Sequence, residues 1–321
     1  MTKALIFGVS GQDGAFLAKR LIKSGEHVYG VTRNISNYSN LKVLNIHEKV
    51  SLKECNLLSE KEVMELISWI QPNEIYFLGG QTSVGKSFLA PVETVQSNTL
   101  TTLYILEAIR RTRLNCKFYN AASSEIYGNT PVNGANETSR FHPMSPYAVS
   151  KIQALDTVRL YRETYDIYAV NGILFNHESF LRPETFVTQK IILSAALIKL
   201  GRLDVLELGN LNISRDWGWA PEYVDVMKYM LQLTDPEDFV IGTGTTTRLE
   251  DYVKLVFEYF SLNYQNYISV NDNYIRLNDI TYSKSDPSKA FEKLNWRATI
   301  TLEQTIEMMC DYQMEKLIIS K

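Results

Sequence analysis

The stretch Lys3-Ala4-Leu5-Ile6-Phe7-Gly8-Val9-Ser10-Gly11-Gln12-Asp13-Gly14 passes from an apolar run into three spaced glycines. The run predicts a buried strand, and the apolar spacing over residues 15–24 predicts a helix after it. At such a junction the first glycine makes a tight turn, the second lets the backbone approach a pyrophosphate, and the third lets helix pack on strand. The helix N-terminus would then face the phosphates. A turn that binds nothing is the alternative, but the flanking strand and helix favour a dinucleotide site.

Strand and helix patterns alternate through the first half of the chain. We expect strands at 3–7, 27–32, 50–54, 74–78, 117–122 and 169–175, and helices at 60–70, 98–111 and 147–165. This alternation predicts an α/β fold with a Rossmann-type doubly wound parallel sheet, whose ligands bind outside the carboxyl ends of the strands. After residue 178 the pattern loosens. We therefore expect a dinucleotide-binding domain over 1–178, with a return near 209–243, and a smaller α/β substrate-binding domain over 179–321.

The composition is that of a globular protein. Hydrophobic residues make up 45% of the 321 residues and charged residues 21%, and the formal charge of -3 argues against general nucleic-acid binding. The three cysteines lack ligand-like spacing, so we expect neither disulfides nor a metal site. We see no signal-peptide pattern and no apolar run of the ~18 residues that a membrane span needs. We therefore expect a cytoplasmic protein without a membrane partner.

A tyrosine and a lysine stand four residues apart in Ser145-Pro146-Tyr147-Ala148-Val149-Ser150-Lys151. If Pro146 opens a helix, Tyr147 and Lys151 share one face. An ammonium beside a phenol favours the phenolate, so the pair is a candidate acid–base unit. Ser123, at the end of an expected strand, could hydrogen-bond the same substrate oxygen. Beside a dinucleotide, these groups make a hydride-transfer site.

Residues at the other strand ends would hold the cofactor. An acid after the second strand binds the ribose of NAD, whereas an arginine accommodates the 2′-phosphate of NADP. Arg33 stands there, which favours NADP, with a solvated surface arginine as the alternative. Asn56 and Leu57 could border an adenine. The small residues after Leu78, including Gly80, would let a ligand lie close to the backbone.

This layout resembles the extended short-chain dehydrogenase/reductase family, whose members oxidise and remake sugar nucleotides. Glu125 sharpens the expectation. A sugar oxidised at C4 has an acidified C5 proton, which a carboxylate two residues beyond Ser123 could remove while the C6 hydroxyl leaves as water. Glu125 could instead merely pair with a neighbour at a strand end. Related decarboxylases of UDP-glucuronate also carry a glutamate here, so Glu125 alone does not decide the reaction.

The chain resembles the GDP-mannose 4,6-dehydratase family from about Ala4 to Met309, and most of the motifs that carry the resemblance lie in its second half. They are Asn171-Gly172-Ile173-Leu174-Phe175-Asn176-His177-Glu178-Ser179, Glu184-Thr185-Phe186-Val187-Thr188, Gly209-Asn210, Arg215-Asp216-Trp217-Gly218 and Asp286-Pro287-x-Lys289-Ala290, together with Gly11-Gln12-Asp13-Gly14. The resemblance implies a lyase that converts GDP-mannose to GDP-4-keto-6-deoxymannose and regenerates its NADP in each turnover. It also implies a homodimer or homotetramer, with helices 98–111 and 147–165 as the candidate interface.

The resemblance carries roles to individual residues. The implied catalytic set is Ser123, Glu125, Tyr147 and Lys151. The implied cofactor set is Gly8, Gly11, Gln12, Asp13, Gly14, Arg33, Asn56, Leu57, Leu78, Gly80, Tyr147, Lys151, His177 and Arg182. The implied substrate set is Ser83, Ser87, Asn176, Lys190, Arg215 and Arg276. Arg215 could instead form a buried pair with Asp216, and His177 could be a satisfied buried histidine.

Two departures from the family pattern leave other functions open. Gln189 stands where the family usually has an arginine, and Phe180 alters the loop after His177. They motivate a second hypothesis, a dehydratase or related enzyme that acts on another GDP-linked or nucleotide-linked sugar. A third hypothesis is a dinucleotide-binding regulator without catalysis. Such a regulator need not keep Tyr147 and Lys151 together with Glu125.

Overall fold

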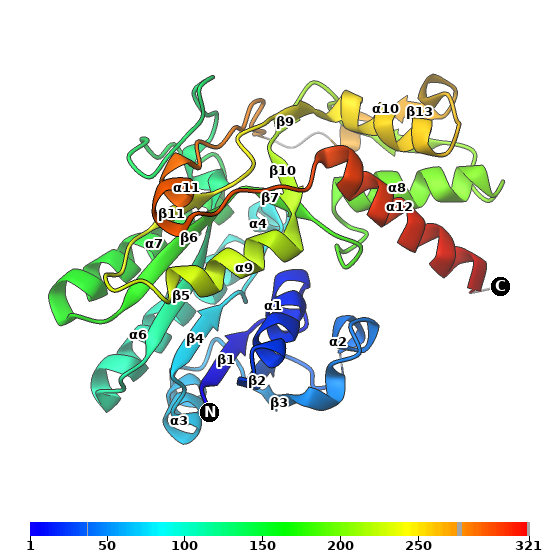
Figure 1. Ribbon diagram of the computed structural model, residues 1–321. Helices are drawn as coiled ribbons and strands as arrows, with labels where there is room; N and C mark the ends of the chain where they lie inside the picture. The colour runs from blue at the N-terminus through cyan, green and yellow to red at the C-terminus, as the bar shows by residue number, and fades with distance from the viewer. Residues whose placement is uncertain (37, 275–277, 320–321) are drawn as a thin grey trace.

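The computed structural model describes residues 1–36, 38–274 and 278–319. Its centre is a sheet of seven parallel strands in the order β11-β6-β5-β4-β1-β2-β3 (Figure 1). The strands are β1 (Lys3–Phe7), β2 (His27–Thr32), β3 (Val50–Glu54), β4 (Glu74–Phe77), β5 (Lys117–Ser123), β6 (Ala169–Leu174) and β11 (Phe239–Ile241). The predicted Rossmann-type parallel sheet is confirmed.

Helices cover both faces of this sheet. Along β1, Ala4 and Ile6 point into one apolar core, whereas Leu5 and Phe7 point into the other. A strand buried on both faces reads as a continuous apolar run, which is why the sequence marks it clearly. The first core lies under α1 (Gln12–Lys23), α9 (Ala220–Met230) and α11 (Ser288–Leu294), and the second under α3 (Glu60–Ile70), α6 (Thr101–Thr112) and α7 (Pro146–Tyr165).

The glycine loop sets how closely α1 approaches β1. Gly8 has a φ of +87°, a conformation that side chains rarely adopt. A Cβ on Gly14 would lie 2.3 Å from the Gly8 carbonyl oxygen, so only glycine lets the helix begin this close to the strand. Gly11 is the N-cap of α1 and supplies no side-chain hydrogen bond, which leaves the first-turn N–H groups without a capping oxygen.

A further apolar core lies beside the sheet (Figure 1). It is formed mainly by α8 (Val187–Lys199), α10 (Leu249–Tyr259) and α12 (Leu302–Ile319). Short strands pair around it: β7 (Asn176–Glu178) with β10 (Trp217–Trp219), β9 (Ser214–Arg215) with β12 (Thr247–Arg248), and β8 (Leu206–Leu208) with β13 (Ile268–Val270). The chain returns to the sheet through α9, β11 and α11. The residue boundaries of the two expected domains stay a prediction.

Smaller elements complete the described part of the chain. They are α2 (Ser39–Val43), α4 (Val84–Leu89), α5 (Pro91–Val95), the π turn η2 (Gln96–Leu100) and the 3-10 turns η1 (His47–Lys49), η3 (Ser124–Tyr127), η4 (Tyr264–Asn266) and η5 (Asp272–Tyr274). The helix expected at 98–111 begins as α6 only at Thr101. In the wider π turn before it, Asn98 donates to Gln81 O at 3.1 Å and to Ser150 Oγ at 3.0 Å. None of the described helices is long and apolar enough to cross a bilayer.

A buried carboxylate fastens α7 to the sheet. Asp238, just before β11, accepts from Arg159 Nε at 2.7 Å, from Arg162 Nη1 at 2.8 Å and from the Asn171 backbone N–H at 2.9 Å. Burial alone would raise the pKa of Asp238, but the two guanidinium groups and this N–H bring it below its usual value. Because both arginines belong to α7, Asp238 fixes the helix that carries Tyr147.

We predict that Asp238→Asn lowers the free energy of unfolding at pH 7 by about 2 kcal/mol, because it removes the charge from several hydrogen bonds. A carboxyl group whose pKa is lower in the native than in the unfolded protein stabilises the fold at pH values above its unfolded pKa of about 3.9. This stabilisation is lost as the pH falls through the native pKa. The gap between wild type and variant should therefore close only below about pH 4. Urea unfolding at several pH values measures this. The exposed Asp235→Asn is the control, and equal stabilities of wild type and Asp238→Asn would contradict the prediction.

Candidate active site

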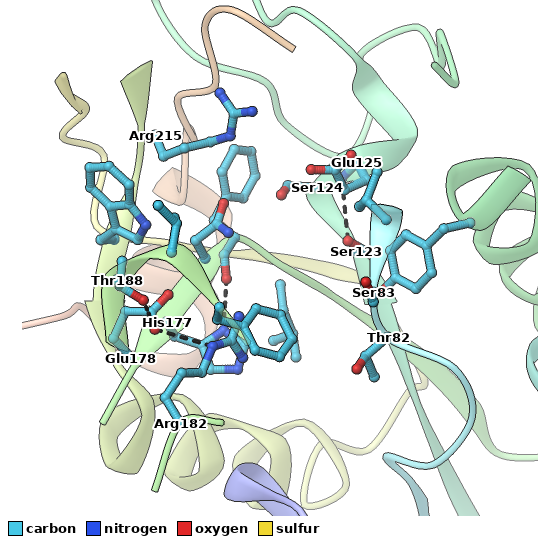
Figure 2. A pocket seen from close by; sticks show the side chains of 18 of the residues that line it. Thr82, Ser83, Ser123, Ser124, Glu125, His177, Glu178, Arg182, Thr188 and Arg215 are labelled. Atoms are coloured by element: carbon cyan, nitrogen blue, oxygen red, sulfur yellow. Dashed lines mark hydrogen bonds and ion pairs between the residues drawn. The ribbon is translucent and has the colours of Figure 1, made fainter. Parts of the chain in front are cut away.

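A cavity of about 660 Å³ opens at the carboxyl edge of the sheet. Residues from the ends of β4, β5 and β6 line one side, and residues from β7, α8 and β9 line the other. All four residues of the predicted catalytic set contribute to its wall: Ser123, Glu125, Tyr147 and Lys151. Figure 2 shows Ser123 and Glu125 together on one side, with Glu178, Arg182 and Thr188 across from them.

Local capping places these four side chains. Ser123 ends β5 and is the N-cap of η3, where its Oγ accepts from the Glu125 backbone N–H at 3.3 Å. The turn therefore brings Glu125 back beside Ser123. Ser145 caps α7 by accepting from the Ala148 N–H at 3.1 Å, and Pro146 is the first helical residue, as predicted. Tyr147 and Lys151 consequently lie one helical turn apart on the cavity side.

Burial dominates the titration of this pair. Burial raises the pKa of Tyr147 to about 12, a hydrogen bond with Ser123 opposes the rise, and the Glu125 carboxylate adds to it. Burial also lowers the pKa of Lys151 to about 8. Lys151 Nζ donates to the Ala121 carbonyl at 2.8 Å and lies 5.7 Å from the Tyr147 ring centroid. In the ligand-free protein burial therefore favours the neutral phenol, and the acid–base role of the pair beside a bound cofactor stays a prediction.

His177 and Asp13 form an ion pair at the cavity wall. His177 Nε2 lies 2.9 Å from Asp13 Oδ2, and Nδ1 lies 2.7 Å from the Phe175 carbonyl. Burial disfavours the imidazolium, but the Asp13 carboxylate outweighs it and raises the pKa of His177. The Tyr223 ring stacks on the imidazole at 4.7 Å. The hydrogen-bonding capacity of His177 is therefore met within the protein, the alternative that the sequence left open.

Glu178 and Thr188, beside them, received no role from the sequence, although two of the motifs contain them. Glu178 Oε2 accepts from Thr188 Oγ1 at 2.7 Å and lies 3.1 Å from Arg182 Nε, and all three line the cavity. The Arg182 guanidinium stacks on the Phe186 ring at 3.7 Å. The signal that could have found this group is a glutamate that follows shortly after β6, at the ligand edge of the sheet.

Arg215 lines the cavity with a different partner from the expected one. Its Nη2 lies 3.1 Å from Asp279 Oδ1. Asp216 is instead fully buried and accepts from Thr243 Oγ1 at 2.7 Å and from the Gly244 N–H at 3.1 Å. The alternative of a buried Arg215–Asp216 pair is therefore wrong, because Arg215 faces the cavity whereas Asp216, between β9 and β10, faces Thr243 and Gly244.

The other predicted substrate residues separate into three groups. Ser83, Asn176 and Lys190 line the cavity. Ser87 does not reach it, because its side chain is fully buried and donates to the Val84 carbonyl at 2.6 Å. Arg276 lies outside the described residues.

The two departures from the family pattern also point away from the cavity. Gln189 is buried between α8 and α12, where its Nε2 donates to Gln313 Oε1 at 3.1 Å. Phe180 packs against Phe16, Trp219 and Tyr312 with ring centroids 5.7, 6.1 and 4.7 Å apart. The expectation that these substitutions alter the sugar-nucleotide pocket directly is therefore not supported.

The predicted cofactor residues divide between the cavity and the adjoining sheet edge. Asp13, Leu78, Tyr147, Lys151, His177 and Arg182 line the cavity. Gly8, Gly11, Gln12, Gly14, Arg33, Asn56, Leu57 and Gly80 lie outside its lining. Some have structural partners: Gln12 accepts from Ser179 Oγ at 2.8 Å, and Asn56 Oδ1 accepts from the Leu58 N–H at 3.1 Å.

The geometry fits a bound dinucleotide. The Gly8–Gly14 contact leaves no room for a side chain where a pyrophosphate would meet the uncapped start of α1. Arg182 Nε is buried and has no hydrogen-bond partner among the described residues, because its N–H does not aim at Glu178. A polar ligand group in the cavity would satisfy it.

Comparison with known proteins identifies relatives along the whole chain. The family model described as GDP-mannose 4,6 dehydratase matches residues 5–309. The chain is 38% identical to GDP-mannose 4,6 dehydratase 2 of Arabidopsis thaliana, over 97% of this chain and 87% of that protein. It is 38% identical to GDP-mannose 4,6-dehydratase of Yersinia enterocolitica, over 95% and 91%. The Cricetulus griseus protein of the same name is 35% identical, over 97% and 91%.

Solved structures with more distant sequences share the fold. A UDP-glucose 4-epimerase from Thermotoga maritima superposes with a TM-score of 0.87 at 23% identity, covering 98% of this chain and 100% of that one. A dTDP-glucose 4,6-dehydratase from Bacillus anthracis superposes with a TM-score of 0.85 at 15% identity, covering 98% and 97%. At these identities the likeness shows the fold alone.

We predict that Asp13→Asn lowers the pKa of His177, because burial would then favour the neutral imidazole without an opposing anion. An NMR titration of the four histidine side chains measures it. The exposed Asp251→Asn is the control for a general charge effect and should leave the His177 curve in place. An unchanged His177 pKa in Asp13→Asn would contradict the assigned ion pair.

Proposed function

Because the chain belongs to the GDP-mannose 4,6-dehydratase family, we propose that it converts GDP-mannose to GDP-4-keto-6-deoxymannose and water. The observation that carries the proposal is the convergence of Ser123, Glu125, Tyr147 and Lys151 on one cavity. A redox-neutral elimination needs a base at the C4 hydroxyl and a second base at C5, both within reach of one hexose. Tyr147 and Glu125 supply these two groups.

Each side chain has a defined proton to hold or move. The Tyr147 oxygen takes the proton of the C4 hydroxyl, and Ser123 hydrogen-bonds the same substrate oxygen. Glu125 removes the C5 proton, which the neighbouring ketone acidifies, and passes it to the C6 hydroxyl, which leaves as water. The proton that Tyr147 took from the C4 hydroxyl balances the protonation of C5 when the hydride returns to C6. A bound nicotinamide dinucleotide supplies the hydride acceptor at C4 and donor at C6. Lys151 orients the site through its hydrogen bond to the Ala121 carbonyl.

We propose NADP as this dinucleotide. Arg33 is exposed one residue beyond β2, and Ser10 Oγ of the glycine loop lies 3.4 Å from Thr32 Oγ1 at the end of that strand. A phosphate on the ribose would meet Arg33 there without meeting a carboxylate at the strand end. We propose that the rest of the dinucleotide contacts the glycine loop, Asn56, Leu57, His177 and Arg182.

We propose that the nucleotide sugar occupies the other half of the cavity. Lys190 and Arg215 line it and supply two cations for a diphosphate, and Asn176 adds an uncharged donor. Lys190 Nζ donates to the Glu207 carbonyl at 2.7 Å, which fixes its position at the wall. An assembly of two or four copies through α6 and α7 is also part of the proposal.

The direct test incubates the NADP-loaded protein with GDP-mannose and follows the 4-keto product by NMR. We expect stoichiometric product without net reduction of added NADP, since oxidation and reduction balance within one turnover. Other nucleotide sugars serve as controls and should give a much lower kcat/KM. Absence of turnover by the loaded protein would contradict the proposed function.

We predict that Glu125→Gln lowers kcat for dehydration by about 100-fold or more, because an amide cannot take the C5 proton. Slow oxidation at C4 should persist, because Tyr147 and Ser123 are unchanged. Mass spectrometry of substrate recovered from deuterium oxide measures hydrogen exchange at C5. In the contrasting variant, Tyr147→Phe, oxidation itself should be lost. Wild-type exchange at C5 in Glu125→Gln would refute the role of Glu125.

We predict that Arg33→Ala raises the Kd for NADP roughly tenfold and leaves that for NAD nearly unchanged, because only NADP has a phosphate to pair. Titration of the ligand-free protein by calorimetry gives both constants. Arg33→Lys keeps a cation and should lose less. The exposed Lys49→Ala should leave the ratio unchanged. If Arg33→Ala weakens both dinucleotides equally, Arg33 is only a surface charge.

A further inference from the structure

Glu178 is a buried carboxylate that the proposed chemistry does not use. It ends β7, and its side chain is 2% exposed. Thr188 Oγ1, in the first turn of α8, donates to its Oε2 at 2.7 Å, and Arg182 Nε lies 3.1 Å from the same oxygen. Figure 2 shows the three side chains together on the wall opposite Ser123 and Glu125.

Arg182 has few other constraints. It lies in the turn segment between β7 and α8, where no helix or strand fixes its backbone. Its guanidinium stacks on the Phe186 ring at 3.7 Å, a contact that limits tilt but allows sliding. Glu178 and the ring together hold the charge in one place at the cavity wall.

Stability alone does not account for this arrangement. A buried ion pair rarely stabilises a fold more than apolar residues of the same volume, because both charges lose their hydration. A charge held at the wall of a cavity, in contrast, acts on every titratable group that lines it.

We propose that Glu178, itself fixed by Thr188, is a positioning residue that holds the Arg182 guanidinium against the cavity, where its charge acts on Tyr147 and His177. Its consequence for turnover rests on the proposed function. The placement of Arg182 by Glu178 is a property of the ligand-free protein and is tested in that form.

The charges around the two responding groups support this assignment. Apart from burial, the pKa of Tyr147 responds to Ser123, Glu125, Arg182 and Asp13, and Arg182 lowers it. The pKa of His177 responds, after burial, to Asp13, Arg182 and the Phe175 carbonyl, and Arg182 again lowers it. Lys151 completes the charged groups that face Tyr147 from α7. The Glu178 carboxylate by its own charge favours the imidazolium of His177, so a rise in the His177 pKa on its removal has to come through Arg182.

The experiment is an NMR titration of His177 in the ligand-free Glu178→Gln variant, beside Arg182→Met. If the carboxylate holds the arginine, both variants raise the pKa of His177, because both withdraw a cation from it. In the loaded enzyme, the acidic limb of kcat/KM for GDP-mannose should move to higher pH in both, and kcat/KM at pH 7 should fall about tenfold or more. The double variant should add little to Arg182→Met.

Matched variants separate the effect of Glu178 on the position of Arg182 from a general effect of removing a charge. Asp251→Asn removes an exposed carboxylate that does not line the cavity and should leave the pKa of His177 unchanged. Thr188→Val keeps the volume and the Glu178 charge but removes the hydroxyl, and should give a smaller shift in the same direction. If Glu178→Gln does not fold, Thr188→Val tests the proposal in its place.

Two results would overturn the proposal. A His177 pKa that stays at the wild-type value in both Glu178→Gln and Thr188→Val, while Arg182→Met moves it, means that Arg182 needs no holder. A downward shift in Glu178→Gln means that the arginine stays in place and the carboxylate acts by its own charge. Because these readings use ligand-free protein, they hold even if GDP-mannose is not the substrate.

Discussion

The common direction of the seven strands is the constraint on which the rest of the structure depends. Because every strand is parallel, their carboxyl ends lie along one edge, and each loop that leaves this edge can contribute to one cavity. The glycine loop after β1, the turn after β5 and the segment after β6 meet there. The close approach of Gly14 to the Gly8 carbonyl lets α1 begin directly beside the end of β1, so that its N-terminus faces this edge. The cavity therefore brings together residues that are far apart in sequence, from the strand ends and from the start of α7.

Pairs of opposite charges in the cavity wall determine the electrostatic potential inside the cavity. Asp13 neutralises His177, Asp279 contacts Arg215 and Glu178 contacts Arg182, so cations that suit a diphosphate are buried together with counter-ions. Tyr147 is surrounded by opposing influences, with burial and Glu125 raising its pKa and Ser123 and Arg182 lowering it. The ligand-free protein consequently holds a neutral phenol. A bound nicotinamide ring in its cationic form would favour the phenolate of Tyr147. Binding of the cofactor would therefore be coupled to formation of the base.

Elements of the fold could be predicted where burial imposes a simple period. The bounds expected for β1, β2, β3 and α3 agree with the structure, because two-sided burial and a one-sided apolar stripe leave clear patterns. Side-chain direction could not be predicted, because it depends on packing across elements. Ser87, Gln189 and Phe180 stand in segments near the site, yet they point into the protein interior. Arg215 pairs with Asp279, a residue 64 positions away, and no local pattern encodes that distance.

The central claim is that one hexose meets Tyr147 and Glu125 while a single hydride leaves C4 and returns at C6. The most direct measurement follows the label in GDP-mannose that carries deuterium at C4, with the NADP-loaded protein in ordinary water. The account predicts one deuterium at C6 of each keto product molecule and none in free NADPH, as read by mass spectrometry and NMR. A product without deuterium at C6 would contradict it, because the hydride would then have left the site between the two steps.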